Sequence, residues 1–152
     1  MARISAEEQE TRRDKLYSIV LELFFEKGWD ALTYDLVAEK SGMRKSTLQG
    51  YFKTKADFSN ALAGRVLPIF LSYLNLTTRS AFVESWTEAL KYRKFRYILS
   101  MMIRNVTSEQ VNELAVSGIT RLIKGVTDHL GEDSYQDLEL LLGRTVIRLA
   151  QQ

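Results

Sequence analysis

The sequence predicts an all-α protein, and three observations lead to that fold class. Apolar residues recur at steps of three and four along most of the chain, which is the period of one helix face. No stretch alternates apolar and polar residues as a half-buried strand does. Proline, which interrupts helices, occurs once in 152 residues, at Pro68. We therefore expect an N-terminal three-helix head followed by a bundle of helices.

Composition excludes several classes of protein. Hydrophobic residues make up 45% of the chain, so it can bury a core, while the lack of cysteine excludes disulfides and thiolate metal sites. The N-terminal segment is too polar for a signal peptide, and no apolar run approaches the roughly 18 residues that span a bilayer. We expect a cytoplasmic protein with no cofactor, no metal ion and no membrane contact.

The first two predicted helices lie in the N-terminal part of the chain. One runs from about residue 5 to residue 27, because the apolar residues between Leu16 and Phe24 follow the spacing of one face, and Gly28 stands where a left-handed residue would end it. The next begins at Thr33, which can cap its first turn, and stops near Gly42.

A third, short helix follows the turn at Gly42. Leu48, Tyr51 and Phe52 form an apolar face at steps of three and four, and Arg44 stands at the start of this helix. Two short helices joined by a glycine-containing turn form a helix-turn-helix, whose second helix enters the major groove of DNA.

The charge of this segment agrees with DNA binding, although the net charge of +2 does not indicate it. Five cations and no acid lie between residues 40 and 55: Lys40, Arg44, Lys45, Lys53 and Lys55. At a helix start, Arg44 forgoes a cap worth about 1 kcal/mol but can donate two hydrogen bonds to guanine. A solvated charged face is the alternative.

Other residues of the third helix can also reach DNA. Lys45, Ser46 and Thr47 are cationic or short enough to contact phosphate or base edges, and Gln49 can read adenine. Gly50 is unfavourable in a helix by about 1 kcal/mol relative to alanine. This cost indicates close approach of the backbone to the sugar–phosphate wall, or else a frayed helix end.

Residues 13–58 resemble the DNA-binding domain of the TetR family of transcriptional regulators. The matching positions, in order and spacing, are Phe24, Gly28, Thr33, Ala38, Gly42, Thr47, Leu48, Phe52 and Lys55. The resemblance implies a dimeric repressor or activator whose helical C-terminal part senses a ligand. It also implies the positions that contact DNA: Thr33, Tyr34, Arg44, Lys45, Ser46, Gln49, Tyr51 and Lys55.

Three of these positions depart from the family pattern. Gln49 replaces the usual tyrosine, Tyr51 an often-found histidine, and Arg44 an often-found serine or threonine. The operator sequence therefore cannot be carried over. Tyr51 can instead pack its ring against the first helix, and Lys55 can be a solvated residue of the helix that follows.

Residues 1–54 are predicted as the DNA-binding domain and residues 55–152 as a helical regulatory and dimerisation domain. The expected helices of the second part cover residues 55–76, 79–93, 95–106, 108–129 and 134–151. Ser134 and Asp137 resemble a capping box at the last of them. Pro68 should kink or end the helix that contains it, which suggests a hinge between the domains.

The last two predicted helices carry more apolar residues than one face needs. We expect them to pair with a second chain in a four-helix dimer interface, as the family does. The predicted interface residues are Ala115, Gly118, Leu122, Gly125, Leu138, Leu141, Leu142, Thr145 and Leu149. A monomer that buries both apolar seams internally is the alternative.

Large aromatic and methionine side chains between head and interface suggest a pocket for a small-molecule effector. The predicted lining is Phe70, Tyr73, Phe82, Trp86, Tyr97, Met101 and Met102. A stripe of this kind at helical spacing is more often core. The basic segment from Lys91 to Tyr97 can bind an anionic effector or a phosphate, although a solvated loop is the commoner explanation.

An enzyme is not indicated, because the single histidine, His129, has no cysteine partner and no suitably spaced acid. It suits a helix C-terminus, where a cation is favourable. A second alternative keeps the fold but replaces the effector with a protein partner, or with a general architectural role on DNA. The residues do not name the operator, the regulated genes or the effector, and do not distinguish repression from activation.

Overall fold

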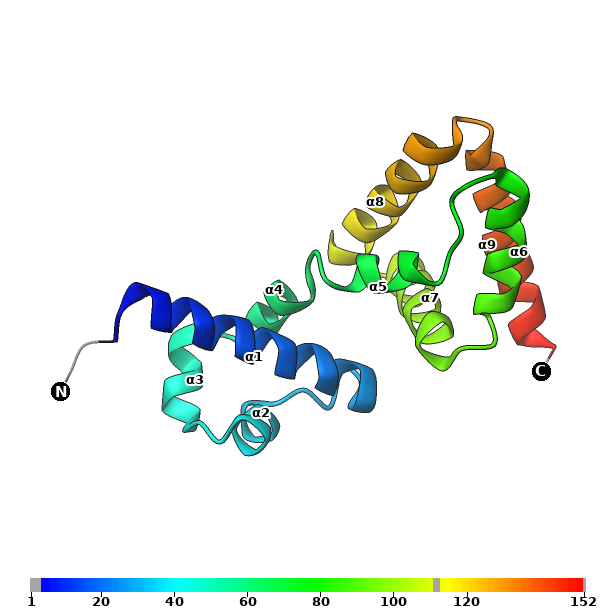
Figure 1. Cartoon of the computed structure of the whole chain (residues 1–152). Coiled ribbons are helices and arrows are strands. Elements are labelled where there is room, and N and C mark those ends of the chain that lie inside the picture. Colours follow the sequence, from blue (N-terminus) through cyan, green and yellow to red (C-terminus); the bar gives the residue numbers. More distant parts are fainter. Residues whose placement is uncertain (1–3, 111–112, 152) are drawn as a thin grey trace. The chain divides into compact units, whose positions relative to one another are not determined.

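The computed structural model describes residues 4–110 and 113–151, with the side chains of all of these except residues 113–115. This part of the chain is helical and contains no strand, which confirms the all-α prediction (Figure 1). It forms two compact units, residues 1–65 and residues 66–152. None of the described helices is long and apolar enough to cross a bilayer.

The first helix of unit 1, α1 (Ala6–Lys27), has the predicted bounds to within one residue. Ser5 caps it by accepting a hydrogen bond from the backbone N–H of Glu8 at 3.2 Å. Gly28 ends it with φ +89°, and its N–H donates to the Phe24 carbonyl at 3.0 Å. The face between Leu16 and Phe25 is buried.

Two short helices follow, α2 (Tyr34–Ser41) and α3 (Lys45–Tyr51). As predicted, the Thr33 side chain caps α2, accepting from the N–H of Leu36 at 3.1 Å. Gly42 adopts the left-handed conformation at φ +72°, where a side chain would be strained, and so allows the sharp turn into α3.

The remainder of unit 1 differs from the single helix predicted over residues 55–76. The chain instead forms a 3-10 turn, η1 (Lys55–Asp57), and a short helix, α4 (Phe58–Leu62), which packs on α1. It leaves helical geometry at Ala63 and Gly64, which has φ +76°. The first compact unit therefore includes η1 and α4, while the predicted boundary of the DNA-binding domain at residue 54 stays a prediction.

Pro68 does not interrupt a helix, contrary to the prediction. It is the third residue of α5 (Val66–Ser72), the first helix of unit 2. The first four N–H groups of a helix have no partner within the helix, so a proline in the first turn removes no hydrogen bond. The break lies before it, around Gly64.

Unit 2 continues with four longer helices, close to the predicted ranges. They are α6 (Arg79–Ala89), α7 (Arg93–Thr107), α8 (Glu113–Leu130) and α9 (Ser134–Ala150). Helix α9 packs between α6 and α8, while α7 packs on α8 and α5 contacts both α7 and α8 (Figure 1).

The capping box predicted at Ser134 and Asp137 is wrong. The hydroxyl of Ser134 is buried and donates to the Gly131 carbonyl, and Asp133 occupies the cap position. Asp137 instead accepts two hydrogen bonds from the Arg79 guanidinium, at 2.7 and 3.2 Å. The Asp137 carboxylate therefore binds a charged side chain of α6 and does not cap its own helix.

Candidate nucleic-acid interface

The turn between α2 and α3 is fixed by local hydrogen bonds. The N–H of Gly42 donates to the Ala38 carbonyl at 2.9 Å, and the N–H of Met43 donates to the Ser41 hydroxyl at 3.2 Å. Val37 and Leu48 are fully buried and hold the two helices together. These contacts fix the orientation of the outer face of α3.

The outer face of α3 consists of polar and cationic side chains. The exposed positions here are Arg44, Lys45, Ser46, Thr47, Gln49 and Gly50, whereas Leu48 points into the core. Arg44 occupies the cap position with extended backbone and makes no capping hydrogen bond. Within the described residues its guanidinium has no hydrogen-bond or ion-pair partner, so its donors are available to a ligand.

Gly50 has no structural reason to be glycine. A Cβ added there meets no heavy atom within 4 Å, and its φ is not in the left-handed region. Glycine lowers helix stability here by about 1 kcal/mol relative to alanine, and no contact inside the fold offsets this loss. The glycine is therefore consistent with an external partner that approaches the backbone closely.

Two predicted contact residues also hold the head together. The Tyr34 hydroxyl donates to the Phe52 carbonyl at 2.6 Å, and its ring lies 5.3 Å from that of Phe58. The ammonium of Lys55 donates to the Asp30 carbonyl at 3.4 Å and lies 5.6 Å from the centre of the Trp29 ring. Both side chains therefore have a structural role besides any contact with DNA.

The other predicted contacts lie at the surface or near it. Thr33 is exposed, and because its oxygen accepts from Leu36, its own O–H can still donate to a phosphate. Tyr51, the last residue of α3, is half-buried.

Sequence reasoning missed one charged neighbour of this surface. Asp35, in the first turn of α2, forms an ion pair with Lys45, with 3.3 Å between Oδ1 and Nζ. No sequence signal identified the pair, because it depends on how the first turns of α2 and α3 face each other.

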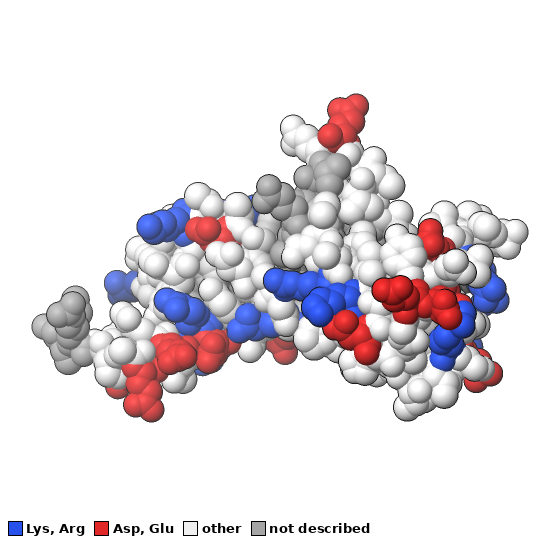
Figure 2. All heavy atoms as spheres, turned by 90° about the horizontal axis from the view of Figure 1, so that it is seen from above, with Lys and Arg blue, Asp and Glu red and all other residues white. Residues whose placement is uncertain are grey.

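On the face drawn in Figure 2, basic and acidic side chains are interspersed. The nucleic-acid hypothesis rests on the local geometry of α2 and α3.

Two family models match the chain, one over each part. Residues 21–62 match the bacterial regulatory proteins of the TetR family, and residues 63–149 match the tetracycline repressor LuxT C-terminal domain. The chain belongs to the TetR family. It is a DNA-binding transcriptional regulator, and regulators of this family are not enzymes. No curated protein matches the chain.

The LuxT-type domain of this TetR-family regulator fills its centre with the aromatic residues predicted to line a pocket. Phe70, Phe82 and Trp86 are buried and pack ring against ring, with centroids 5.5 to 6.0 Å apart. Phe95, which the prediction omitted, stacks on Phe70 at 4.4 Å. Tyr73, Tyr97 and Met101 are half-buried.

An apolar hollow of about 250 Å³ lies elsewhere, among α7, α8 and α9. Of the residues predicted to line a pocket, Met102 alone borders it. Its other lining residues are Leu99, Ile103, Val106, Ile119, Leu122, Leu142, Gly143 and Val146.

The predicted dimer residues divide into two groups. Leu122, Leu138, Leu141 and Thr145 are buried within one chain, where they leave no surface for a partner. Gly118, Gly125, Leu142 and Leu149 are half-buried, and the side chain of Ala115 lies outside the described residues.

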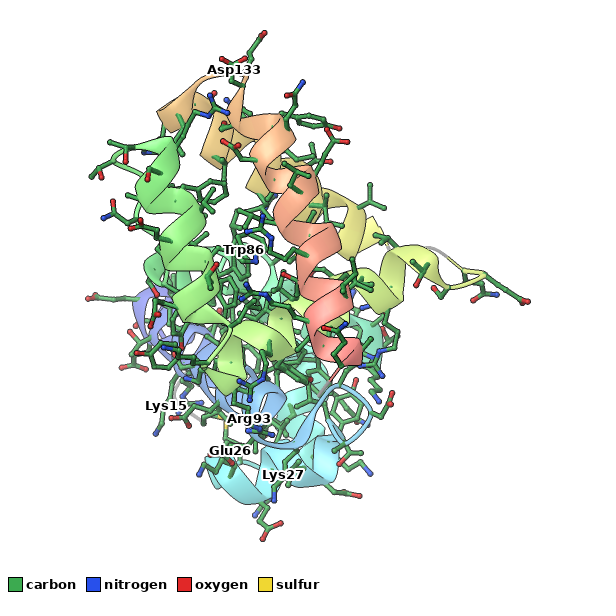
Figure 3. All side chains as sticks on the ribbon, turned by 90° about the vertical axis from the view of Figure 1, so that its right-hand side faces the viewer. Lys15, Glu26, Lys27, Trp86, Arg93 and Asp133 are labelled. Carbon is green, nitrogen blue, oxygen red and sulfur yellow. The ribbon has the colours of Figure 1, made fainter. Side chains whose placement is uncertain are left out.

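Two of the exposed apolar residues of α9 lie on its opposite face. Leu140 is 65% exposed and Ile147 is 61% exposed, with Gly143 between them at steps of three and four. Figure 3 shows α9 on the outside of unit 2, with Trp86 on its inner side toward α6.

Proposed function

We propose that this TetR-family protein is a dimeric, sequence-specific repressor that binds an inverted-repeat operator. The observation that supports sequence-specific binding is the exposed face of α3, where Arg44 stands at the helix start without a partner among the described residues. A free guanidinium at this position can form the bidentate pair with guanine that is the commonest specific contact in the major groove. The remaining predicted residues of α2 and α3 contact phosphates, which position the head, or base edges.

The outer face of α9 is the proposed dimer surface. Exposed Leu140 and Ile147 flank Gly143, whose Cβ position is open, so that a second backbone can approach closely. A two-fold axis between Gly143 and Arg144 places each Leu140 opposite Ile147 of the partner subunit. A two-fold interface requires such self-complementarity.

Two heads related by this axis engage half-sites in successive major grooves, roughly 34 to 36 Å apart or more. The operator is then an inverted repeat. Repression, rather than activation, is supported by the description of the matching C-terminal family as a tetracycline repressor domain.

Control by a small molecule has limited support. The hollow among α7, α8 and α9 holds about 250 Å³, slightly below the range of about 300 to 1,000 Å³ of typical ligand pockets. Its lining is wholly apolar, so a ligand there would be small and uncharged. The filled aromatic core favours the second candidate function, in which a protein partner or an architectural role replaces the effector.

Selection of bound duplexes from a random DNA pool at a fixed salt concentration tests the proposal. We expect an inverted repeat, and with Arg44→Ala we expect weaker binding and relaxed preference at one position of each half-site, by about 1 to 3 kcal/mol. Arg13→Ala, which removes the same charge from the exposed surface of α1, is the matched control and should leave the selected sequence unchanged. Recovery of no sequence, with equal binding to all duplexes, would support the architectural role instead.

A further inference from the structure

The stretch from Lys40 to Lys55 contains no acid, but the fold brings one to it. Asp35 of α2 lies 3.3 Å from the ammonium of Lys45, the first residue of α3. The Asp35 side chain is 82% exposed and that of Lys45 is 53% exposed. A carboxylate therefore stands among the cations of the candidate nucleic-acid interface.

Stability does not explain why Lys45 is there. An exposed ion pair contributes little to folding, with a typical value of about 0 to 1 kcal/mol. Asp35 already suits its own helix, because an acid in the first turn of α2 faces the positive end of the helix dipole. Lys45 does not suit its helix, since a cation at the start of α3 faces the same positive end.

The pair does change how Lys45 can meet DNA. Sequence-independent binding rests on cations that neutralise phosphates and release counterions. A lysine that is already paired with a carboxylate must lose that partner before it neutralises a phosphate. The exposed carboxylate also repels phosphate by itself.

We propose that Asp35 is a specificity-determining residue, which holds Lys45 on the base-reading face of α3 and prevents it from acting as a general phosphate contact. This inference rests on the proposed sequence-specific binding. On the operator the ion pair is retained, and the oriented ammonium meets acceptors on base edges. On other DNA the protein binds with one phosphate contact fewer.

The test compares affinities for the selected operator and for a shuffled duplex of equal length and composition, measured by fluorescence anisotropy over a series of salt concentrations. With Asp35→Asn we expect several-fold tighter binding to the shuffled duplex, and a slope of log affinity against log salt steeper by about 0.9. Operator affinity should stay unchanged or fall, so the specificity ratio falls. Asp35→Glu, which can still reach Lys45, should behave as wild type.

Two controls separate the pair from general charge. Glu39→Gln removes the same charge one turn further along α2, at an exposed residue without an ion pair to Lys45, and should shift both duplexes alike. In a Lys45→Gln background, Asp35→Asn should no longer steepen the salt slope for the shuffled duplex.

Several results would overturn the inference. It fails if Asp35→Asn and Glu39→Gln shift both duplexes equally, or if the steeper slope persists without Lys45. A wild-type protein that does not distinguish the two duplexes would instead refute the proposed sequence-specific function, which is a separate outcome.

Discussion

At the scale of single residues, each side chain of α3 has either an inward or an outward role. Leu48 is fully buried, and the preceding positions from Arg44 to Thr47 are exposed. This division follows from helical spacing, which is why the sequence could predict that Leu48 is buried. It could not predict that Tyr34 donates to the Phe52 carbonyl or that Asp35 pairs with Lys45. Those contacts join residues that only the tertiary fold brings together.

Gly50→Ala distinguishes an effect on the stability of the fold from an effect on DNA binding. Because the new methyl group meets no heavy atom within 4 Å and alanine favours the helix by about 1 kcal/mol, the free protein should unfold at the same or a higher temperature. Operator affinity should fall, because the methyl group stands where the backbone approaches the sugar–phosphate wall. Thermal unfolding and duplex binding measure the two effects. Unchanged affinity would show that no close approach occurs at this position.

At the scale of elements, the sequence predicted helix ends well where the signal is local. Thr33 and Gly28 cap and end their helices as expected, because a capping side chain and a left-handed glycine act within a few residues. The helix predicted over 55–76 was wrong because Gly64 takes a positive φ and turns the chain before Pro68. The aromatic stripe was ambiguous, since the same residues can fill a core or line a pocket until their neighbours are known.

Helices α6 and α9 are joined by a buried hydrogen bond between side chains. The indole N–H of Trp86 donates to the Thr145 hydroxyl at 2.9 Å, and that hydroxyl donates to the Leu141 carbonyl at 2.7 Å. Thr145→Val keeps the volume but leaves the indole N–H unpaired, which should lower the free energy of unfolding by about 1 to 3 kcal/mol. Urea unfolding measures this loss. Thr145→Ser, which keeps the hydroxyl, should cost less, and equal losses would show that packing alone accounts for the effect.

An ion pair joins the same two helices near their starts. The hydrogen bonds from Arg79 lower the pKa of Asp137 below its usual value. Because the folded pKa is lowered, the carboxylate stabilises the fold at any pH above its unfolded pKa of about 3.9, and this contribution disappears as the pH falls through the folded pKa. Asp137→Asn should therefore lower the unfolding temperature by a few degrees at pH 7.

The stabilisation by the Asp137 carboxylate should depend on pH. The difference in unfolding temperature between wild type and Asp137→Asn should be constant near neutral pH and shrink in acid, below about pH 4. Asp133→Asn is the matched control, because this more exposed carboxylate lies 3.9 Å from Arg79 and should matter far less. A difference that persists undiminished in strong acid would mean that the carboxylate charge is not what stabilises the contact.

At the scale of the whole molecule, the sequence alone does not determine which of the two faces of α9 is buried within the chain. Both faces are apolar, and helical spacing identifies each of them. Which face is internal depends on the helices packed against it, and α6 and α8 cover the face of Leu138, Leu141 and Thr145. The predicted dimer residues were drawn mainly from that inner face. The outer face, with Leu140 and Ile147, is therefore the one open to a second chain.

Ile147→Glu tests this surface. A charge within the proposed seam, opposite Leu140 of the partner subunit, would be buried without a partner and should convert the dimer to a monomer. Light scattering after size exclusion measures the mass, and a monomer should also lose operator affinity because each head then binds its half-site alone. Tyr92→Glu, at a residue 57% exposed outside α9, is the control and should remain dimeric. A dimer that persists with Ile147→Glu would contradict the proposed surface and show that a different surface of the chain forms the dimer.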